Sequence, residues 1–376
     1  MRGASVNGRG VAAGPYALTF GWDVGGAHLK VSATGTSGRI DDVGQWACPL
    51  WQGLDHLHRA IDLALARWPA AARPDVRHAV TMTGEMVDLF ASREDGVRAI
   101  AEALAARLGP HVRFYGGDAG WLSAQHCADA WRQVASANWL ATASWLATRL
   151  PDAVLVDIGS TTTDIVPISN GRVVAEARDD AGRLATGELV YQGVVRTPLC
   201  GLAQRVAFGG TFVNVMNEWF ATTADVYRLT GELDAAHDVH ASADGGPKTE
   251  AASRVRLARM IGRDAREASD ADWLRFALRW RTLQLAQTGI NLERVEGHHD
   301  GLASAPLVGA GCGRFLVAAL ARERGRPYVD IGALTGASGQ CGDWAATCAP
   351  SVALALLAAR ASPFDASAPG VAARRT

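Results

Sequence analysis

The strongest constraint on this chain is a local pattern that occurs twice. Residues 16–34 and 153–176 each begin with a short apolar strand, break at an Asp-x-Gly turn and then resume an extended pattern. A strand that stops at a carboxylate and a glycine before resuming is typical of a hairpin with a tight turn. The copies share too few residues to be a tandem repeat. They predict two related lobes, each opening with the same turn.

The second copy carries the most chemistry. It reads Asp157-Ile-Gly-Ser-Thr-Thr-Thr-Asp164, a run of hydroxyl side chains between two aspartates. Backbone N–H groups in such a turn converge on an anion, and hydroxyls donate to phosphate oxygens, while Asp157 and Asp164 suit a magnesium ion held through its waters. The alternative is a plain hairpin with solvated aspartates. The expected phosphate ligands are Gly159, Ser160, Thr161, Thr162 and Thr163.

The first copy reads Asp23-Val-Gly-Gly-Ala-His-Leu-Lys30. Gly25 and Gly26 are expected to bind phosphate through the backbone, and Asp23 is a third candidate metal ligand. Lys30 can return across the hairpin as a point charge toward a phosphate. Taken alone this segment is equally consistent with a simple hairpin, and its pairing with the second copy favours a phosphate site.

A glycine-rich turn, Gly309-Ala-Gly-Cys-Gly313, leaves an expected strand and opens an expected helix. Such a turn places bare amides and the positive end of a helix against an anion or a nucleotide sugar. Gly309, Ala310 and Gly311 are therefore candidate ligand-binding residues. Close packing of a helix against a strand explains the same glycines equally well.

Alternating strand and helix patterns surround these turns and favour an α/β layer structure. Helices are expected over residues 53–67, 93–108, 123–150, 249–261, 271–296, 313–322 and 350–360. Further short strands are expected at residues 78–83, 112–115, 306–309 and 328–331.

The expected domain organisation follows from the two copies of the strand–turn–strand pattern, each of which opens a lobe. At 376 residues the chain is long enough for two domains. We expect a flexible extension over residues 1–15, a first lobe over 16–150, a second lobe over 151–361 and a frayed tail over 362–376. The second lobe is expected to contain a helical insert at about 217–300 and the glycine turn 309–313.

Composition narrows the class of protein. The formal net charge of −1 gives no overall basic field for nucleic acid, and no apolar stretch approaches the ~18 residues of a membrane span. The N-terminus lacks a hydrophobic signal core, and the six cysteines form no Cys-x-x-Cys pair. Together these features predict a cytoplasmic protein with reduced thiols that binds neither nucleic acid nor membrane, and they leave a homodimer open.

The three turns together resemble the superfamily of actin, the sugar kinases and the heat-shock chaperone ATPases. The second turn is similar to that of the hydantoinase/oxoprolinase branch. Further segments resemble a small offshoot of it, the aryl-ether-forming synthases of methanofuran biosynthesis and their bacterial relatives in tetrahydromethanopterin-linked one-carbon metabolism. These segments are Thr186-Gly-Glu-Leu-Val-Tyr-Gln-Gly193, Arg196-Thr-Pro198, Thr222-Thr-Ala-Asp225-Val-Tyr227 and Asp244-Gly-Gly-Pro-Lys-Thr249.

This resemblance implies a two-lobed actin-like (ribonuclease H-like) fold with a cleft between the lobes. It also implies a Mg²⁺-dependent transferase with small-molecule diphosphate and phenolic substrates. The phenol of a glutamyl-tyramine or glutamyl-tyrosine compound would attack an (aminomethyl)furan-methyl diphosphate, releasing diphosphate and leaving an aryl ether in methanofuran or methylofuran. The loops and Mg²⁺ would hold the diphosphate as charge builds on it.

A phenol needs a base or a cation nearby to become a good nucleophile. The candidates are Asp23, Asp225 and Lys248, with no ranking among them, while Lys30 and Asp157 complete the expected catalytic set. Asp225 follows two threonines and is alternatively a helix cap. Glu188 and Tyr191 are expected in the cleft, with a hairpin role as the alternative.

Two other functions fit the same loops. One is an ATP-dependent small-molecule kinase or hydantoinase/oxoprolinase-like hydrolase, in which residues 309–313 contact the ribose or base. The other is a non-catalytic nucleotide-binding scaffold, which would not require Asp23, Lys30, Asp157 and Asp164 together.

Overall fold

The computed structural model describes residues 18–35, 37–337, 339–361 and 364, so the expected extension and nearly all of the expected tail lie outside the described residues. A first sheet has the strand order β3-β2-β1-β4-β5-β6. The hairpin β1–β2 is antiparallel, and β1 also pairs with β4 in parallel. The strands are β1 (Thr19–Val24), β2 (His28–Thr34), β3 (Ile40–Ala47), β4 (Arg77–Met82), β5 (Val112–Tyr115) and β6 (Trp121–Leu122).

The second sheet repeats this opening. Its order is β10-β8-β7-β13-β14, with β9 paired to β8; β7–β8 is an antiparallel hairpin, and β7 pairs with β13 in parallel. The predicted two-lobed α/β plan is therefore confirmed. The strands are β7 (Ala153–Ile158), β8 (Thr163–Ser169), β9 (Arg172–Val173), β10 (Leu189–Val190), β13 (Leu307–Ala310) and β14 (Tyr328–Asp330).

Helices α1 (Leu54–Arg67) and α2 (Arg93–Leu108) follow the predicted ranges and bury one face on the first sheet. The predicted helical segment 123–150 is divided into α3 (Ala124–Cys127), α4 (Trp131–Val134) and α5 (Asn138–Ala147). The break before α5 contains Ser136, a non-glycine residue with a φ of 51°. A side chain in this left-handed region is strained, and such strain is concentrated at functional sites.

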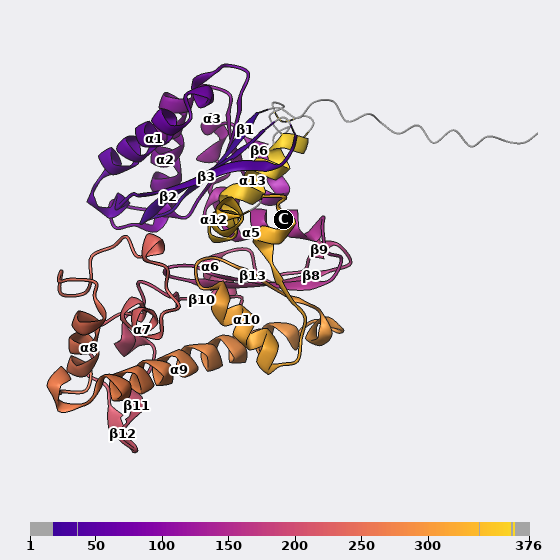
Figure 1. Ribbon diagram of the computed structural model, residues 1–376. Helices are drawn as coiled ribbons and strands as arrows, with labels where there is room; N and C mark the ends of the chain where they lie inside the picture. The colour runs from indigo at the N-terminus through magenta and orange to yellow at the C-terminus, as the bar shows by residue number, and fades with distance from the viewer. Residues whose placement is uncertain (1–17, 36, 338, 362–363, 365–376) are drawn as a thin grey trace, which may run out of the picture.

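Two helices far apart in the sequence lie between the sheets (Figure 1). They are α5 and the C-terminal helix α13 (Ala349–Arg360), and apolar residues of both belong to the buried cluster that contains strands of the second sheet. Helix α13 also packs on β1, where a Cβ on Gly21 would lie 1.9 Å from the carbonyl oxygen of Ser351. The C-terminal helix of the described chain thus returns to the first sheet.

We therefore expect Gly21→Ala to be strongly destabilising. The added methyl group meets helix backbone, which cannot move aside as a side chain can, and overpacking of this kind costs about 1–3 kcal/mol or more. The measurement is the free energy of unfolding in urea. Gly342→Ala is the control, because its Cβ would meet no atom closer than 3.6 Å. Equal stability of the two variants would contradict this packing.

The rest of the second lobe covers the face of its sheet opposite α5 and α13. Long helix α9 and α10 pack against this sheet, and the hairpin β11–β12 projects beyond α9 (Figure 1). The elements on this face are β11 (Arg205–Phe208), β12 (Thr211–Asn214), α7 (Thr223–Thr230), α8 (Glu250–Arg259), α9 (Asp270–Glu296) and α10 (Arg314–Glu323). The exceptions are α6 (Asp180–Thr186), which contacts the edge strand β10, and α11 (Ile331–Leu334) and α12 (Gln340–Thr347), whose buried residues belong to the same cluster as those of α5 and α13.

None of the described helices is by itself both long and apolar enough to cross a membrane. Helices α12 and α13 pass that test by length and composition only when taken together, across a bend of 97°.

Candidate functional site

A cavity of about 480 Å³ lies where the two opening hairpins face each other. Both predicted phosphate turns line it, which confirms the cleft between the lobes. From the first lobe it is lined by Asp23, Gly25, Gly26, Ala27, His28, Lys30 and Trp51, and from the second by Asp157, Gly159, Ser160, Thr161, Thr162, Asp164, Tyr191 and Arg196.

The two turns are held in the same way. In the first, the carbonyl oxygens of Gly26 and Ala27 accept hydrogen bonds from backbone N–H groups of residues 50 and 48, at 3.0 and 2.8 Å. In the second, the carbonyls of Gly159 and Ser160 accept from the N–H groups of residues 194–196, at 2.8–3.1 Å. These bonds keep the carbonyl lone pairs occupied, while Gly25 and Gly159 donate their own N–H groups within the turns, to the carbonyls of His28 and Thr162 at 2.9 Å, which leaves the N–H groups between them as the expected anion donors. This polarity suits an anion.

Asp23 and Lys30 face each other across the β1–β2 register, with Nζ 3.8 Å from Asp23 Oδ2. Burial opposes the charge on Lys30, but Asp23 and Asp157 raise the pKa of Lys30 above its usual value. Burial raises the pKa of Asp23 despite Lys30. The second oxygen of Asp23, Oδ1, is buried without a hydrogen-bond partner among the described residues. A buried carboxylate oxygen of this kind needs a ligand or an ion to satisfy it.

Asp157 and Asp164 are paired in the β7–β8 register, as Asp23 and Lys30 are in the first lobe. Burial, then Asp164, raises the pKa of Asp157 to about 7, although Lys30 opposes the shift. Arg183 Nη1 donates to Asp164 Oδ1 at 2.9 Å, yet burial still raises the pKa of Asp164. Asp23, Asp157 and Asp164 share this part of the cavity with two cations, Lys30 and Arg183, so a bound cation would stabilise the carboxylates.

The predicted glycine turn does not line the cavity. Gly309 and Ala310 are buried in β13, and a Cβ on Gly311, which has a φ of 79°, would lie 2.5 Å from Asp157 Oδ1. Gly313 N–H donates to the carbonyl of Ile158 at 2.8 Å. The glycine turn therefore packs behind the second phosphate turn and lets β13 approach Asp157. This arrangement corresponds to the alternative of close packing between a helix and a strand.

Two further predicted ligands are turned away from the cavity. Glu188 is buried, and its carboxylate accepts the backbone N–H groups of Glu176 and Ala177 at 2.7 and 3.3 Å, so it closes a loop as the hairpin alternative proposed. The hydroxyl of Thr163 donates to the carbonyl of Gln192 at 2.7 Å. Tyr191 does line the cavity, and its side chain is exposed.

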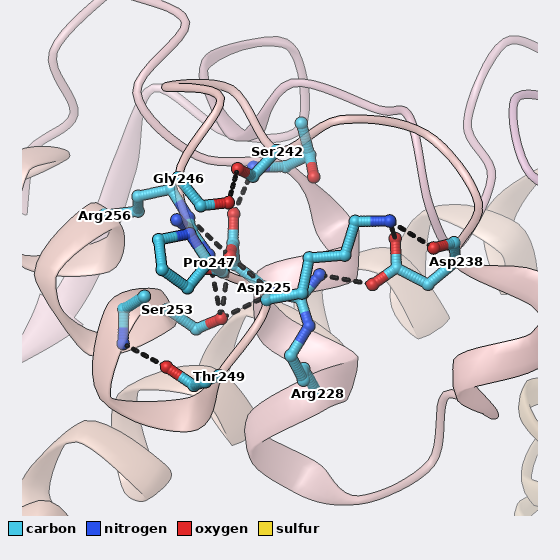
Figure 2. A network of polar contacts seen from close by, with 12 residues as sticks. Asp225, Arg228, Asp238, Ser242, Gly246, Pro247, Thr249, Ser253 and Arg256 are labelled. Atoms are coloured by element: carbon cyan, nitrogen blue, oxygen red, sulfur yellow. Dashed lines mark hydrogen bonds and ion pairs between the residues drawn. The ribbon is translucent and has the colours of Figure 1, made fainter.

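Asp225 lies in a separate polar network in the insert (Figure 2), and Lys248 joins that network through Asp238. Asp225 Oδ1 accepts hydrogen bonds at 2.8 Å from Arg228, Ser253 and Arg256, and Asp225 completes a capping box at the start of α7. Lys248 donates to the carbonyl of Asp238. The structure thus gives Asp225 the capping role and does not bring either residue to the cavity lining.

Asp225→Ala is therefore expected to act on stability rather than on turnover. It removes the buried one of the two carboxylates paired with the fully buried Arg256 and leaves only the partly exposed Asp244, and removing one partner of a buried ion pair typically costs about 3–5 kcal/mol. The free energy of unfolding should fall by that amount, with KM unchanged in whatever protein remains folded. Asp118→Ala, at a 94% exposed side chain, is the control and should change stability by less than about 1 kcal/mol. A large rise in KM at unchanged stability would contradict this role.

Sequence patterns missed a polar cluster at the cavity wall. Arg93 Nη2 lies 2.9 Å from Glu85 and 3.1 Å from Asp180, and the hydroxyl of Ser136 donates to both carboxylates. Ser136, Asp180 and the nearby Arg183 line the cavity. No motif marks these residues, because they come from separate loops and helices. The one detectable signal, the positive φ of Ser136, appears only in the structure.

The sheets and the cavity between them define a two-lobed protein with the fold of the actin and sugar kinase class. The fold is similar to a nucleotide-free acetone carboxylase, which carries out ATP-dependent acetone carboxylation, at a TM-score of 0.55 and 12% identity over 89% of this chain and 70% of that one. The hydantoinase/oxoprolinase family model matches residues 77–358, and the chain belongs to that family.

Two curated relatives are each named (4-{4-[2-(gamma-L-glutamylamino)ethyl]phenoxymethyl}furan-2-yl)methanamine synthase. The one from Methanocaldococcus jannaschii is 29% identical over 263 residues, covering 69% of this chain and 76% of the relative. The one from Methanococcus vannielii is 31% identical over 160 residues, covering 43% and 71%. The resemblance to this group of synthases is confirmed.

Proposed function

We propose that this protein is a transferase that joins an (aminomethyl)furan-methyl diphosphate to the phenol of a glutamyl-tyramine or glutamyl-tyrosine compound. The observation that carries the proposal is the pair of turns that line one cavity beside Lys30 with their carbonyls tied back by hydrogen bonds. Two such turns suit two linked phosphates. The names of the relatives describe an aryl ether between a phenol and a furan methyl group, which supplies the substrate class.

The carboxylates fit a hydrated magnesium ion. Among the described residues no three His, Cys, Asp or Glu side chains are close enough to bind a metal directly. Mg²⁺ retains most of its waters and needs few protein ligands. The unsatisfied Oδ1 of Asp23 and the raised pKa of Asp157 are the features that a nearby cation would relieve. Asp23, Asp157 and Asp164 are the residues that would hold Mg²⁺, which would neutralise charge on the diphosphate.

The reaction breaks the furfuryl C–O bond, whose electron pair leaves with the diphosphate, and forms a bond from the phenol oxygen to the same carbon. Lys30 and the N–H groups of both turns stabilise the charge that grows on the leaving group. Of the three candidates for accepting the phenolic proton, Asp23 is the one that lines the cavity, and we assign it that role. The products are the aryl ether, diphosphate and one proton.

The ATP-dependent alternative assigns a ribose or base to residues 309–313, and that turn packs behind Asp157 instead. The deciding experiment incubates the protein with the furfuryl diphosphate, a glutamyl-tyramine acceptor and Mg²⁺ without ATP, and detects the coupled ether by mass. Formation of the ether supports the transferase. No ether, together with micromolar binding or hydrolysis of ATP, would move the protein to the ATP-dependent enzymes of this fold, and nucleotide binding without any turnover to a scaffold.

A further inference from the structure

One cation at the cavity lacks an anionic partner. Arg196 lines the cavity and is partly buried, yet it forms no ion pair with any residue that the structure describes. Its guanidinium carbon lies 5.2 Å from the ring centroid of Trp51. By contrast, Arg183 and Arg93, at the other side of the cavity, are paired with Asp164 and with Glu85 and Asp180. A stacked guanidinium keeps its N–H fork free for a carboxylate.

Aromatic side chains lie beside Arg196. His28 and His240 join the two lobes through a 3.0 Å contact between their Nε2 atoms, and the His240 ring lies 6.3 Å from that of Trp51. Burial, with smaller effects of His240 on His28 and of Arg196 on His240, lowers the pKa of His28 to about 2 and that of His240 to about 4. Both imidazoles are neutral near pH 7. The other charges that act on them, Lys248 and Lys30, are paired with Asp238 and Asp23, so Arg196 is the unpaired charge beside these rings among the described residues.

This wall is fixed to both phosphate turns. The N–H of Arg196 donates to the carbonyl of Ser160 at 2.8 Å, and the helical turn that contains Trp51 begins at Leu50, whose N–H donates to Gly26. Whatever binds Arg196 and Trp51 is therefore placed beside an anion held by the turns. The exposed ring of Tyr191 also lines the cavity.

We propose that Trp51, Tyr191 and Arg196 form the acceptor subsite, in which Arg196 binds the carboxylate of the phenolic substrate and the aromatic side chains flank its ring. The inference rests on the proposed function. We favour a carboxylate over a phosphate as the ligand of Arg196. The turns and Lys30 already supply donors for the diphosphate, whereas Arg196 lies beside aromatic side chains that suit the phenolic substrate. An arginine beside a tryptophan suits an aromatic ligand that carries an anionic group, because the guanidinium binds the anion and the indole contacts the ring.

The test compares Arg196→Met with Arg196→Lys and with Arg172→Met, a control at an exposed arginine of β9. Acceptors are glutamyl-tyramine and tyramine, which lacks the carboxylate. Arg196→Met should raise the KM for glutamyl-tyramine about 10- to 100-fold, the loss expected for one charged hydrogen-bonded contact, with kcat little changed. The KM for tyramine and for the diphosphate should stay constant. Arg196→Lys should give a KM for glutamyl-tyramine between those of the parent protein and Arg196→Met, and Arg172→Met should have the KM of the parent protein.

A rise in the KM for the diphosphate, or an equal effect on tyramine and glutamyl-tyramine, would overturn the assignment. Calorimetric binding of glutamyl-tyramine without the diphosphate separates this proposal from the proposed function. If the parent protein makes no ether but binds glutamyl-tyramine, and Arg196→Met weakens that binding, the subsite stands and the reaction does not. Equal binding by both proteins would overturn the subsite even if the ether forms.

Discussion

Asp157→Asn is expected to lower kcat/KM for ether formation by about 10³-fold, an effect of the size seen when one electrostatic contact to a developing charge is removed. The residue ends β7 where the second phosphate turn begins, and Gly311 packs directly behind it. The amide is nearly isosteric, so the turn keeps its shape while the negative charge is lost. The measurement is steady-state turnover by mass detection of the ether.

The stability of the same variant gives an independent check. The pKa of Asp157 is raised to about 7 from 3.8, so the folded protein holds a proton that the unfolded chain has released between those values. The stability of the parent protein must then fall relative to Asp157→Asn as the pH rises from about 4 to about 7. Thermal unfolding without Mg²⁺ at several pH values measures this difference. Asp152→Asn, at the exposed opposite end of β7, is the control, and a large loss of activity there would contradict the assignment.

Gly193→Ala is expected to lower activity by about 10²-fold or more, because a small displacement of positioning groups is enough to cause a loss of this size. A Cβ on Gly193 would lie 2.4 Å from backbone atoms of both Ser160 and Thr161. These are the atoms of the second phosphate turn, which must shift to admit the methyl group. The expected signature is a rise in the KM for the diphosphate together with a fall in kcat.

The matched control for Gly193 is Gly201→Ala in the same lobe, where a Cβ meets nothing within 4 Å. Its kinetics should match those of the parent protein. Gly193→Ala with unchanged KM and kcat would show that the turn does not hold the diphosphate. A loss of activity that follows a loss of folded protein, measured by circular dichroism, would be a stability effect and would contradict the prediction as well.

The sequence was sufficient for the two-lobed fold and for bringing both phosphate turns to one cavity. Their signal is local, since a strand, an Asp-x-Gly turn and a returning strand are adjacent in the chain and repeat. The hairpin registers then place Asp23 opposite Lys30 and Asp157 opposite Asp164. These two pairings follow from the spacing of the residues within each hairpin, so they could be predicted from the sequence alone.

The remaining features depend on contacts between distant segments. The glycines of residues 309–313 have the same local pattern whether they face a ligand or the back of Asp157, and only the parallel pairing of β13 with β7 decides between them. The capping role of Asp225 was visible locally, but its place in a buried network away from the cavity depends on Arg256, 31 positions away. Arg196 stands out only because its guanidinium lies over the ring of Trp51 while no carboxylate in the described part of the chain pairs with it.

The central claim is that the leaving group is diphosphate and that no nucleotide is consumed. The most direct measurement is phosphorus NMR of a complete reaction without ATP, with the ether quantified in parallel by mass. The account predicts one diphosphate for each ether, no release without the phenolic acceptor, and formation of both products about 10³-fold more slowly by Asp157→Asn. Ether formation that requires ATP and releases phosphate from it would contradict the account.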